Sequence, residues 1–102
     1  MKESDIQKKI IKHLEANGAW VVKVISANKN GVPDVLACLG GHFVAVEVKA
    51  PGKLSTLKPL QQWQLDQITK AGGTAMAVDS LGSLEAIMQS IMPDSQIGDN
   101  DD

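Results

Sequence analysis

Residues 34–49 read DVLACLGGHFVAVEVK, and this stretch decides the fold. Its two apolar runs, DVLACL and HFVAVEVK, are joined by Gly40-Gly41. A Gly-Gly pair between two such runs predicts a β-hairpin with a two-residue primed turn, because glycine adopts the positive φ angles that this turn requires. The turn fixes the register of the whole hairpin, since Leu39 must then pair with His42 and every other pair follows from it.

Two acidic side chains face each other in this predicted register. Asp34 lies directly opposite Glu47, with Cβ atoms roughly 4.5–5.5 Å apart. Their repulsion would destabilise the hairpin by up to about 1 kcal/mol, and a divalent cation between them would relieve it. Oxygen ligands of this kind suit Mg²⁺ or Mn²⁺. The hairpin therefore predicts a metal site at the end away from its turn.

Lys49 adds a third group to this site. Period-two alternation places it on the same face as Glu47, whereas the valines of that strand face the core. An ammonium there can orient or help to deprotonate an attacking water, and it can stabilise charge that develops on a phosphate. The alternative is that these are ordinary solvated residues at strand ends. The predicted register and the Gly-Val-Pro sequence before Asp34 favour the catalytic interpretation.

The other elements follow from hydrophobic periodicity and from capping residues. In chain order we predict a helix with apolar positions Ile6, Ile10, Ile11 and Leu14 that ends at Gly18, a strand over 19–25, the hairpin, a loop over 50–58, a helix over 59–71, a strand over 74–78 and a last helix capped by Ser80. This α-β-β-β-α-β-α order predicts one α/β domain over residues 1–92, with a mixed sheet flanked by helices. Residues 93–102 form an acidic tail that we expect to be disordered.

Composition limits the classes of protein to which the chain can belong. No apolar segment approaches the roughly 20 residues of a membrane span, and the N-terminus lacks the apolar stretch of a signal peptide. We therefore expect an intracellular, cytoplasmic protein. The single cysteine, Cys38, excludes an internal disulfide, and its apolar neighbours predict a buried, inert thiol. Together with His13 and His42 it supplies too few ligands for a structural zinc site, and we expect structural or surface roles for both histidines.

The formal net charge of −2 is unevenly distributed along the chain. The last ten residues hold four of the twelve acids and no lysine, so the rest of the chain has ten lysines against eight acids, a balance of +2. The chain has no arginine, which is the commonest bidentate reader of guanine. We therefore expect any bound DNA to be recognised through its phosphates and shape rather than its base sequence.

Gly31-Val32-Pro33-Asp34, followed by Glu47-Val48-Lys49, resembles the PD-(D/E)xK nuclease signature. More narrowly, residues 1 to about 90 resemble the small stand-alone VRR-NUC domains of phage-type and bacterial proteins, which are akin to Holliday junction resolvases. The context agrees, with an early acid on the first helix and a glutamine-bearing helix that ends in Gly-Gly. The resemblance implies a restriction-endonuclease-like fold with an α-β-β-β-α-β core, and hydrolysis of DNA with Mg²⁺ or Mn²⁺.

The resemblance also assigns roles by position. Asp34 and Glu47 resemble the family's metal ligands, with the Val48 carbonyl as a further ligand, and Lys49 resembles its catalytic lysine. Glu3 resembles the acid of the first helix that completes the site. Asp5 is its competitor, and attraction to the helix dipole explains an acid in a first turn equally well.

Gln61 falls on the same narrow arc of its helix as Leu65 and Ile68. A glutamine on an apolar stripe either finds a hydrogen-bond partner or faces a site, and the resembled family has a glutamine here that reaches the metal site. The family often has Ser-Pro-x-Gln, whereas this chain has Lys58-Pro59-Leu60-Gln61 after a longer loop. This departure affects the expected DNA contacts of the loop rather than the core site.

Together these features predict a Mg²⁺- or Mn²⁺-dependent endonuclease that acts on DNA as a homodimer. The family resemblance implies branched DNA, especially four-way junctions, as its substrate. The main alternative is a catalytically silent DNA-binding module that keeps the nuclease fold, and the intact Asp34, Glu47 and Lys49 argue against it. Trp63 lies outside the apolar arc of its helix, which predicts a subunit interface. A platform for an unpaired base and an indole half-buried under a loop are the competing interpretations.

Overall fold

The computed structural model describes residues 1–91, so the predicted tail over 93–102 lies outside the described residues. Its elements are α1 (Glu3–Ala16), β1 (Trp20–Lys23), β2 (Val35–Leu39), β3 (His42–Val48), the 3₁₀ turn η1 (Leu54–Thr56), α2 (Pro59–Lys70), β4 (Thr74–Val78) and α3 (Leu81–Ile91). The predicted element order is confirmed. The differences are that β1 is shorter than the predicted strand over 19–25 and that η1 forms within the predicted loop over 50–58. No helix within residues 1–91 is long and apolar enough to cross a membrane.

The hairpin of β2 and β3 has the predicted turn and register. Gly40 and Gly41 have φ angles of 57° and 83°, so both central residues of the turn adopt the positive φ of a type I′ turn. Leu39 pairs with His42, and the pairing continues to Val35 and Val46. The next pair beyond the strand end is therefore Asp34 and Glu47, as the sequence predicts.

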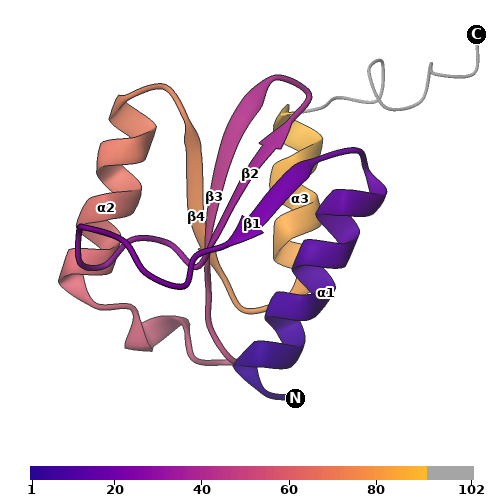
Figure 1. Ribbon diagram of the computed structural model, residues 1–102. Coiled ribbons are helices and arrows are strands. Elements are labelled where there is room, and N and C mark those ends of the chain that lie inside the picture. Colours follow the sequence, from indigo (N-terminus) through magenta and orange to yellow (C-terminus); the bar gives the residue numbers. More distant parts are fainter. Residues whose placement is uncertain (92–102) are drawn as a thin grey trace, which may run out of the picture.

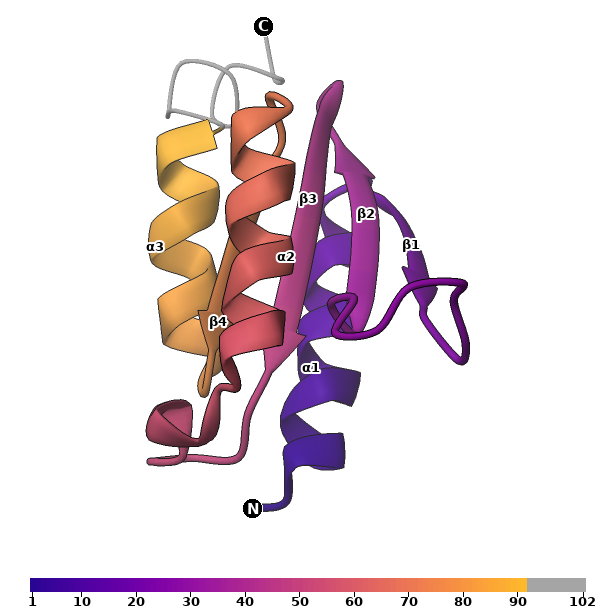
Figure 2. The ribbon, with the colours of Figure 1, turned by 90° about the vertical axis from the view of Figure 1, so that its left-hand side faces the viewer.

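The four strands lie in the sheet in their chain order, β1-β2-β3-β4. The first three form an antiparallel meander, and β4 lies parallel to β3 after the α2 crossover. α1 and α3 cover one face of the sheet and α2 lies on the other (Figure 1). Seen from the α2 side, this helix overlies β3 and β4, and no helix lies in front of β1 and β2 (Figure 2).

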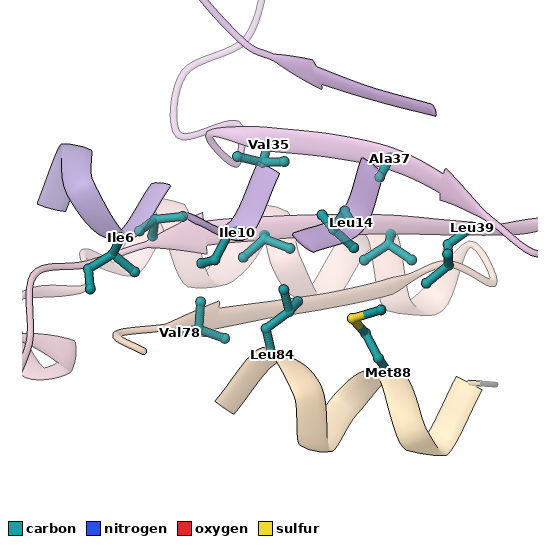
Figure 3. Packing of buried hydrophobic residues seen from close by; sticks show 12 residues of the cluster. Ile6, Ile10, Leu14, Val35, Ala37, Leu39, Val78, Leu84 and Met88 are labelled. Atoms are coloured by element: carbon teal, nitrogen blue, oxygen red, sulfur yellow. The ribbon is translucent and has the colours of Figure 1, made fainter. Parts of the chain in front are cut away.

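The hydrophobic core lies between the sheet and the α1–α3 layer. Alternate residues of the strands point into it together with the apolar stripes of both helices (Figure 3). Its buried members are Ile6, Ile10, Leu14, Val35, Ala37, Leu39, Val44, Val46, Val48, Val78, Leu84 and Met88. Because the valines of β3 fill this core, the intervening residues of β3 must face α2, and this alternation directs Glu47 and Lys49 toward the site.

The prediction that Cys38 is buried is wrong, because its side chain is exposed. Val35, Ala37 and Leu39 of β2 face the core, so alternation turns Cys38 to the opposite face. That face is not covered by α2 at β2 (Figure 2). The apolar residues around Cys38 therefore indicated a strand correctly. They did not indicate which face of that strand a helix would cover.

Candidate active site

The candidate site lies where β2 begins and β3 ends, at the far end of the hairpin from its turn. Asp34 is half-buried there, and its Oδ2 accepts a hydrogen bond of 3.0 Å from the backbone N–H of Val48. Glu47, opposite Asp34, is only 3% exposed. The turn chemistry of Gly40-Gly41 thus places two carboxylates side by side on a sheet face that the core does not use.

Among residues 1–91, Glu47 has one oxygen with polar partners and one oxygen without a hydrogen-bond partner. Its Oε2 lies 3.4 Å from the Lys49 ammonium and accepts a hydrogen bond of 3.2 Å from Gln61 Nε2. Its Oε1 is buried and has no hydrogen-bond partner among residues 1–91. Burial raises the pKa of Glu47 from 4.5 to about 7, and the negative charges of Asp34 and Glu3 contribute to the rise while Lys49 opposes it.

Gln61 connects the sheet to α2. Its Oε1 accepts hydrogen bonds from Lys49 Nζ at 3.1 Å and from the Lys58 backbone N–H at 2.9 Å, while its Nε2 donates to Glu47. An amide that receives two donors at its oxygen and gives one to a carboxylate has its orientation fixed. Lys49, itself 9% exposed, is thereby held beside Glu47 in a place from which water is largely excluded.

The structure separates the two acids that compete on α1. Asp5 Oδ2 accepts a hydrogen bond of 3.0 Å from the Lys2 backbone N–H, so Asp5 caps the helix. Glu3 instead lies close enough to Glu47 for its charge to raise the pKa of that carboxyl. At 100° per residue, Glu3 also shares the sheet-facing side of α1 with Ile10 and Leu14. The first helix thus brings Glu3, and not Asp5, to the edge of the site.

Two loop anchors beside the site were not predicted from the sequence. Gln64 is buried, and its Nε2 donates a 2.9 Å hydrogen bond to the Asn30 carbonyl in the loop that leads to Asp34. Gly31 of that loop has φ +78°, and a Cβ there would lie 3.0–3.2 Å from Leu60 of α2. The signal was present, because the argument that singled out Gln61 on α2 applies equally to a buried Gln64.

The second anchor holds the loop on the other side of the site. Asp79, which directly follows β4, accepts a hydrogen bond of 3.0 Å from the Gly52 backbone N–H. The two histidines lie outside the site. The Nε2 of His13 on α1 lies 3.6 Å from the Oε2 of Glu85 on α3. His42 is exposed at the turn end of β3.

The donor set at this end of the hairpin fits a hard divalent cation. Carboxylate oxygens are the ligands that Mg²⁺ and Mn²⁺ prefer, and the unpartnered Glu47 Oε1 is a buried acceptor that such an ion would satisfy. Within residues 1–91, no three His, Cys, Asp or Glu side chains converge on one point. Ligands beyond Asp34 and Glu47 would therefore come from backbone carbonyls, from solvent or from a rearranged Glu3.

Comparison with known proteins identifies the family and the fold of the chain. Residues 1–77 match the family model of the archaeal Holliday junction resolvase (Hjc). The chain belongs to the Hjc family. A solved structure named "VRR_NUC domain" superposes on it with a TM-score of 0.74 and 26% sequence identity, covering 87% of this chain and 96% of that one. A second, "VRR_NUC domain protein", has a TM-score of 0.69 over 87% of this chain and 86% of that one; at 16% identity it shows the fold alone. None of the curated proteins matches the chain.

This Hjc-family chain is thus a VRR-NUC-type nuclease domain by sequence and by fold, as the resemblance implied. The α/β fold with a mixed sheet between helices is also confirmed.

Proposed function

We propose that this Hjc-family chain is a metal-dependent endonuclease that hydrolyses phosphodiester bonds of DNA at the cluster of Asp34, Glu47, Lys49 and Gln61. The observation that carries this proposal is Glu47 Oε1, a buried oxygen without a hydrogen-bond partner among residues 1–91. It belongs to a carboxyl group that faces Asp34 and whose Oε2 lies 3.4 Å from the Lys49 ammonium. A folded domain seldom leaves such an acceptor unsatisfied, since doing so costs about 1–3 kcal/mol. A cation that binds there explains both the orphan oxygen and the opposed acids.

Asp34 and Glu47 would hold Mg²⁺ or Mn²⁺, with the Val48 carbonyl and Glu3 as further donors. The bound ion would act as a Lewis acid toward the scissile phosphate. Lys49 is held by Gln61 at 3.1 Å and by Glu47 at 3.4 Å, so its ammonium is already oriented before DNA arrives. In this desolvated place a fixed positive charge stabilises a phosphate that gains negative charge more strongly than it would in water.

The substrate we propose is branched DNA, with the four-way junction as its main form. The family whose model matches residues 1–77 is named for resolving Holliday junctions. A chain with ten lysines and no arginine is suited to contacts with phosphates at a shape-defined place rather than to reading bases. We further propose that it acts as a homodimer, because a two-fold axis presents two equal sites to two strands of opposite polarity.

The test is cleavage of a labelled four-way junction and of a duplex with the same sequence, in Mg²⁺, in Mn²⁺ and in EDTA. We expect junction cleavage with either metal and none in EDTA. Lys49→Ala should slow single-turnover cleavage by at least roughly 100-fold, which corresponds to about 2.7 kcal/mol of lost stabilisation, while DNA binding changes little.

Lys53→Ala, on the exposed loop before η1, is the matched control and should cut at the wild-type rate once saturated. It should lose about one unit of salt slope if Lys53 touches a phosphate. Cleavage by Lys49→Ala at the wild-type rate would refute the assignment of the active site. Tight junction binding without cleavage in either metal would instead favour the silent DNA-binding module.

A further inference from the structure

The N-terminal half of α1 carries a buried polar side chain that has no role so far. Gln7 is only 8% exposed, and its amide has no hydrogen-bond partner within residues 1–91. The polar side chains of α1 and its C-cap that do have partners there are Asp5, His13 and Asn17. Proteins rarely bury an amide, with its two donors and its acceptor, without a partner. The amide of Gln7 keeps some contact with solvent, because Glu47 Oε1 is the one fully buried side-chain nitrogen or oxygen of residues 1–91 that lacks a partner.

Gln7 lies at the end of the core that adjoins the candidate site. The preceding residue, Ile6, is at the opposite end of the core from Leu39, which leads into the hairpin turn (Figure 3). The site is at the end of the hairpin away from that turn. Around the axis of α1, Gln7 is about 120° from His13, which faces Glu85 of α3. Since Gln7 is buried and α1 packs on β1, β2 and β3, it faces the sheet beside the site rather than α3.

Glu3 lies one turn before Gln7 on the same side of α1. Residues four apart on a helix are neighbours, and these two differ by about 40° around its axis. Helical side chains point back toward the N-terminus, so the Gln7 side chain extends over the turn that carries Glu3. Glu3 is exposed and has no hydrogen-bond or ion-pair partner within residues 1–91, although its charge acts on Glu47. An unpaired carboxylate and an unpaired amide are therefore neighbours at the edge of the site.

We propose that Gln7 is a positioning residue, whose Nε2 donates a hydrogen bond to Glu3 when that carboxylate turns toward the metal ion. This rests on the metal site of the proposed function. An exposed glutamate loses rotamer freedom when it joins such a site, and a hydrogen bond to its ionised oxygen offsets that loss. A neutral donor suits this place, because a cation beside Glu3 would compete with the metal ion. Lys49 is not available for the task, since Gln61 and Glu47 already hold it.

The first experiment measures Mn²⁺ affinity by calorimetry without DNA, and the urea midpoint of unfolding in EDTA. In Gln7→Leu the dissociation constant for Mn²⁺ should rise roughly 10- to 100-fold, the usual effect of losing a group that orients a metal ligand. The urea midpoint should stay the same or rise, because an apolar side chain replaces a buried amide without a partner. Gln89→Leu, the same change at an exposed position of α3, should leave both quantities unchanged.

The second experiment asks whether Gln7 acts through Glu3. Glu3→Gln alone should weaken Mn²⁺ binding. Adding Gln7→Leu to it should change the dissociation constant by less than about 2-fold, whereas independent effects would multiply. Gln7→Glu keeps the length of the side chain and an oxygen but loses the donor. At pH 8 this variant should bind Mn²⁺ more weakly than wild type, because the new carboxylate repels Glu3.

Equal Mn²⁺ affinities of wild type and Gln7→Leu would overturn the role of Gln7 and leave the metal site standing. A lower urea midpoint with unchanged affinity would do the same and make Gln7 a structural residue. Tighter binding by Gln7→Glu, or a multiplied loss in the double variant, would make position 7 a metal ligand in its own right and overturn the positioning role. A wild-type chain that binds neither Mn²⁺ nor Mg²⁺ would overturn the proposed function and this inference together.

Discussion

Glu47 concentrates the electrostatics of the site in one carboxyl group. It is buried and it faces Asp34. Among the groups that shift its pKa, Lys49 is the one cation. Without metal this carboxyl is mostly neutral below pH 7, since its pKa is raised to about 7. The same buried surroundings that destabilise the ionised carboxylate would favour the binding of a divalent cation, because the ion would replace the missing solvation.

We therefore expect metal-free stability to fall as pH rises. Between pH 4.5 and about 7 the folded chain keeps a proton on Glu47 that the unfolded chain has released, so stability declines through that window, by on the order of 3 kcal/mol in total. Urea melts in EDTA at pH 5 and pH 8 measure it. Glu47→Gln should remove this decline, whereas Glu15→Gln, at an exposed position of α1, should retain it. An unchanged pH dependence in Glu47→Gln would contradict the assigned pKa.

Asp34→Asn should separate function from stability. It removes one of the two opposed charges and keeps an oxygen that can accept the Val48 N–H. In EDTA the variant should be as stable as wild type or more stable by up to about 1 kcal/mol, a rise of several degrees in Tm for a domain of this size. Cleavage should fall by at least roughly 100-fold, since the proposed metal ion would lose one of its ligands. A large loss of metal-free stability would show that Asp34 is a structural residue.

At the scale of elements, α2 holds the site from two sides. Its first turn carries Gln61, which bonds to Lys49 and Glu47 of β3. One turn later Gln64 holds the Asn30 carbonyl, and Leu60 meets Gly31 of the same loop. The loop ends at Asp34, so one helix supports both carboxylates, whose pairing is set by the hairpin.

Gln64→Leu should make the loop over 26–33 more mobile without creating a cavity in the core. Amide hydrogen exchange over residues 26–33 should accelerate, because the hydrogen bond to the Asn30 carbonyl is lost. Cleavage should slow by roughly 10- to 100-fold through misplacement of Asp34. Gln67→Leu is the control, on the same helix but without a hydrogen bond to the loop among residues 1–91. If exchange over 26–33 is equal in both variants, Gln64 does not position the loop.

The hairpin was predictable from the sequence, whereas the partners of the loop anchors were not, for a physical reason. A two-residue turn and period-two alternation are local, so Gly40-Gly41 alone sets the pairing of Asp34 with Glu47. The contact between Asn30 and Gln64 joins residues 34 positions apart, and no local pattern encodes it. The exposure of Cys38 could not be predicted for the same reason, because it depends on which strands the distant helix α2 covers.

At the scale of the whole molecule, charge is divided along the chain. The four aspartates of residues 93–102 lie outside the described residues, and they turn a balance of +2 into a net charge of −2. The domain that carries the site is thus mildly basic. Two of its eight acids, Asp34 and Glu47, would be neutralised further if they hold a divalent ion.

Truncation after Met92 should tighten binding to DNA, because it removes four negative charges and no positive one. The gain should be largest at low ionic strength, where the screening length reaches about 30 Å at 0.01 M salt, and it should shrink at 0.15 M. Fluorescence anisotropy with a labelled junction at both salt concentrations measures it. A variant with the four aspartates changed to asparagine controls for the length of the tail. Equal affinities of all three proteins at low salt would show that the tail stays away from the DNA.

The order of the strands in the sheet equals their order in the chain, and this has a consequence for how the protein is made. Contacts between sequence neighbours close short loops and form early. A chain that leaves the ribosome from its N-terminus thus exposes the β1-β2-β3 segment, with Asp34 and Glu47, before Gln61 emerges. The two acids meet first and repel each other, and the arrival of α2 completes their surroundings. During synthesis the nascent site is an exposed pair of carboxylates, and it becomes a closed, lysine-bearing site only after the helix has folded over it.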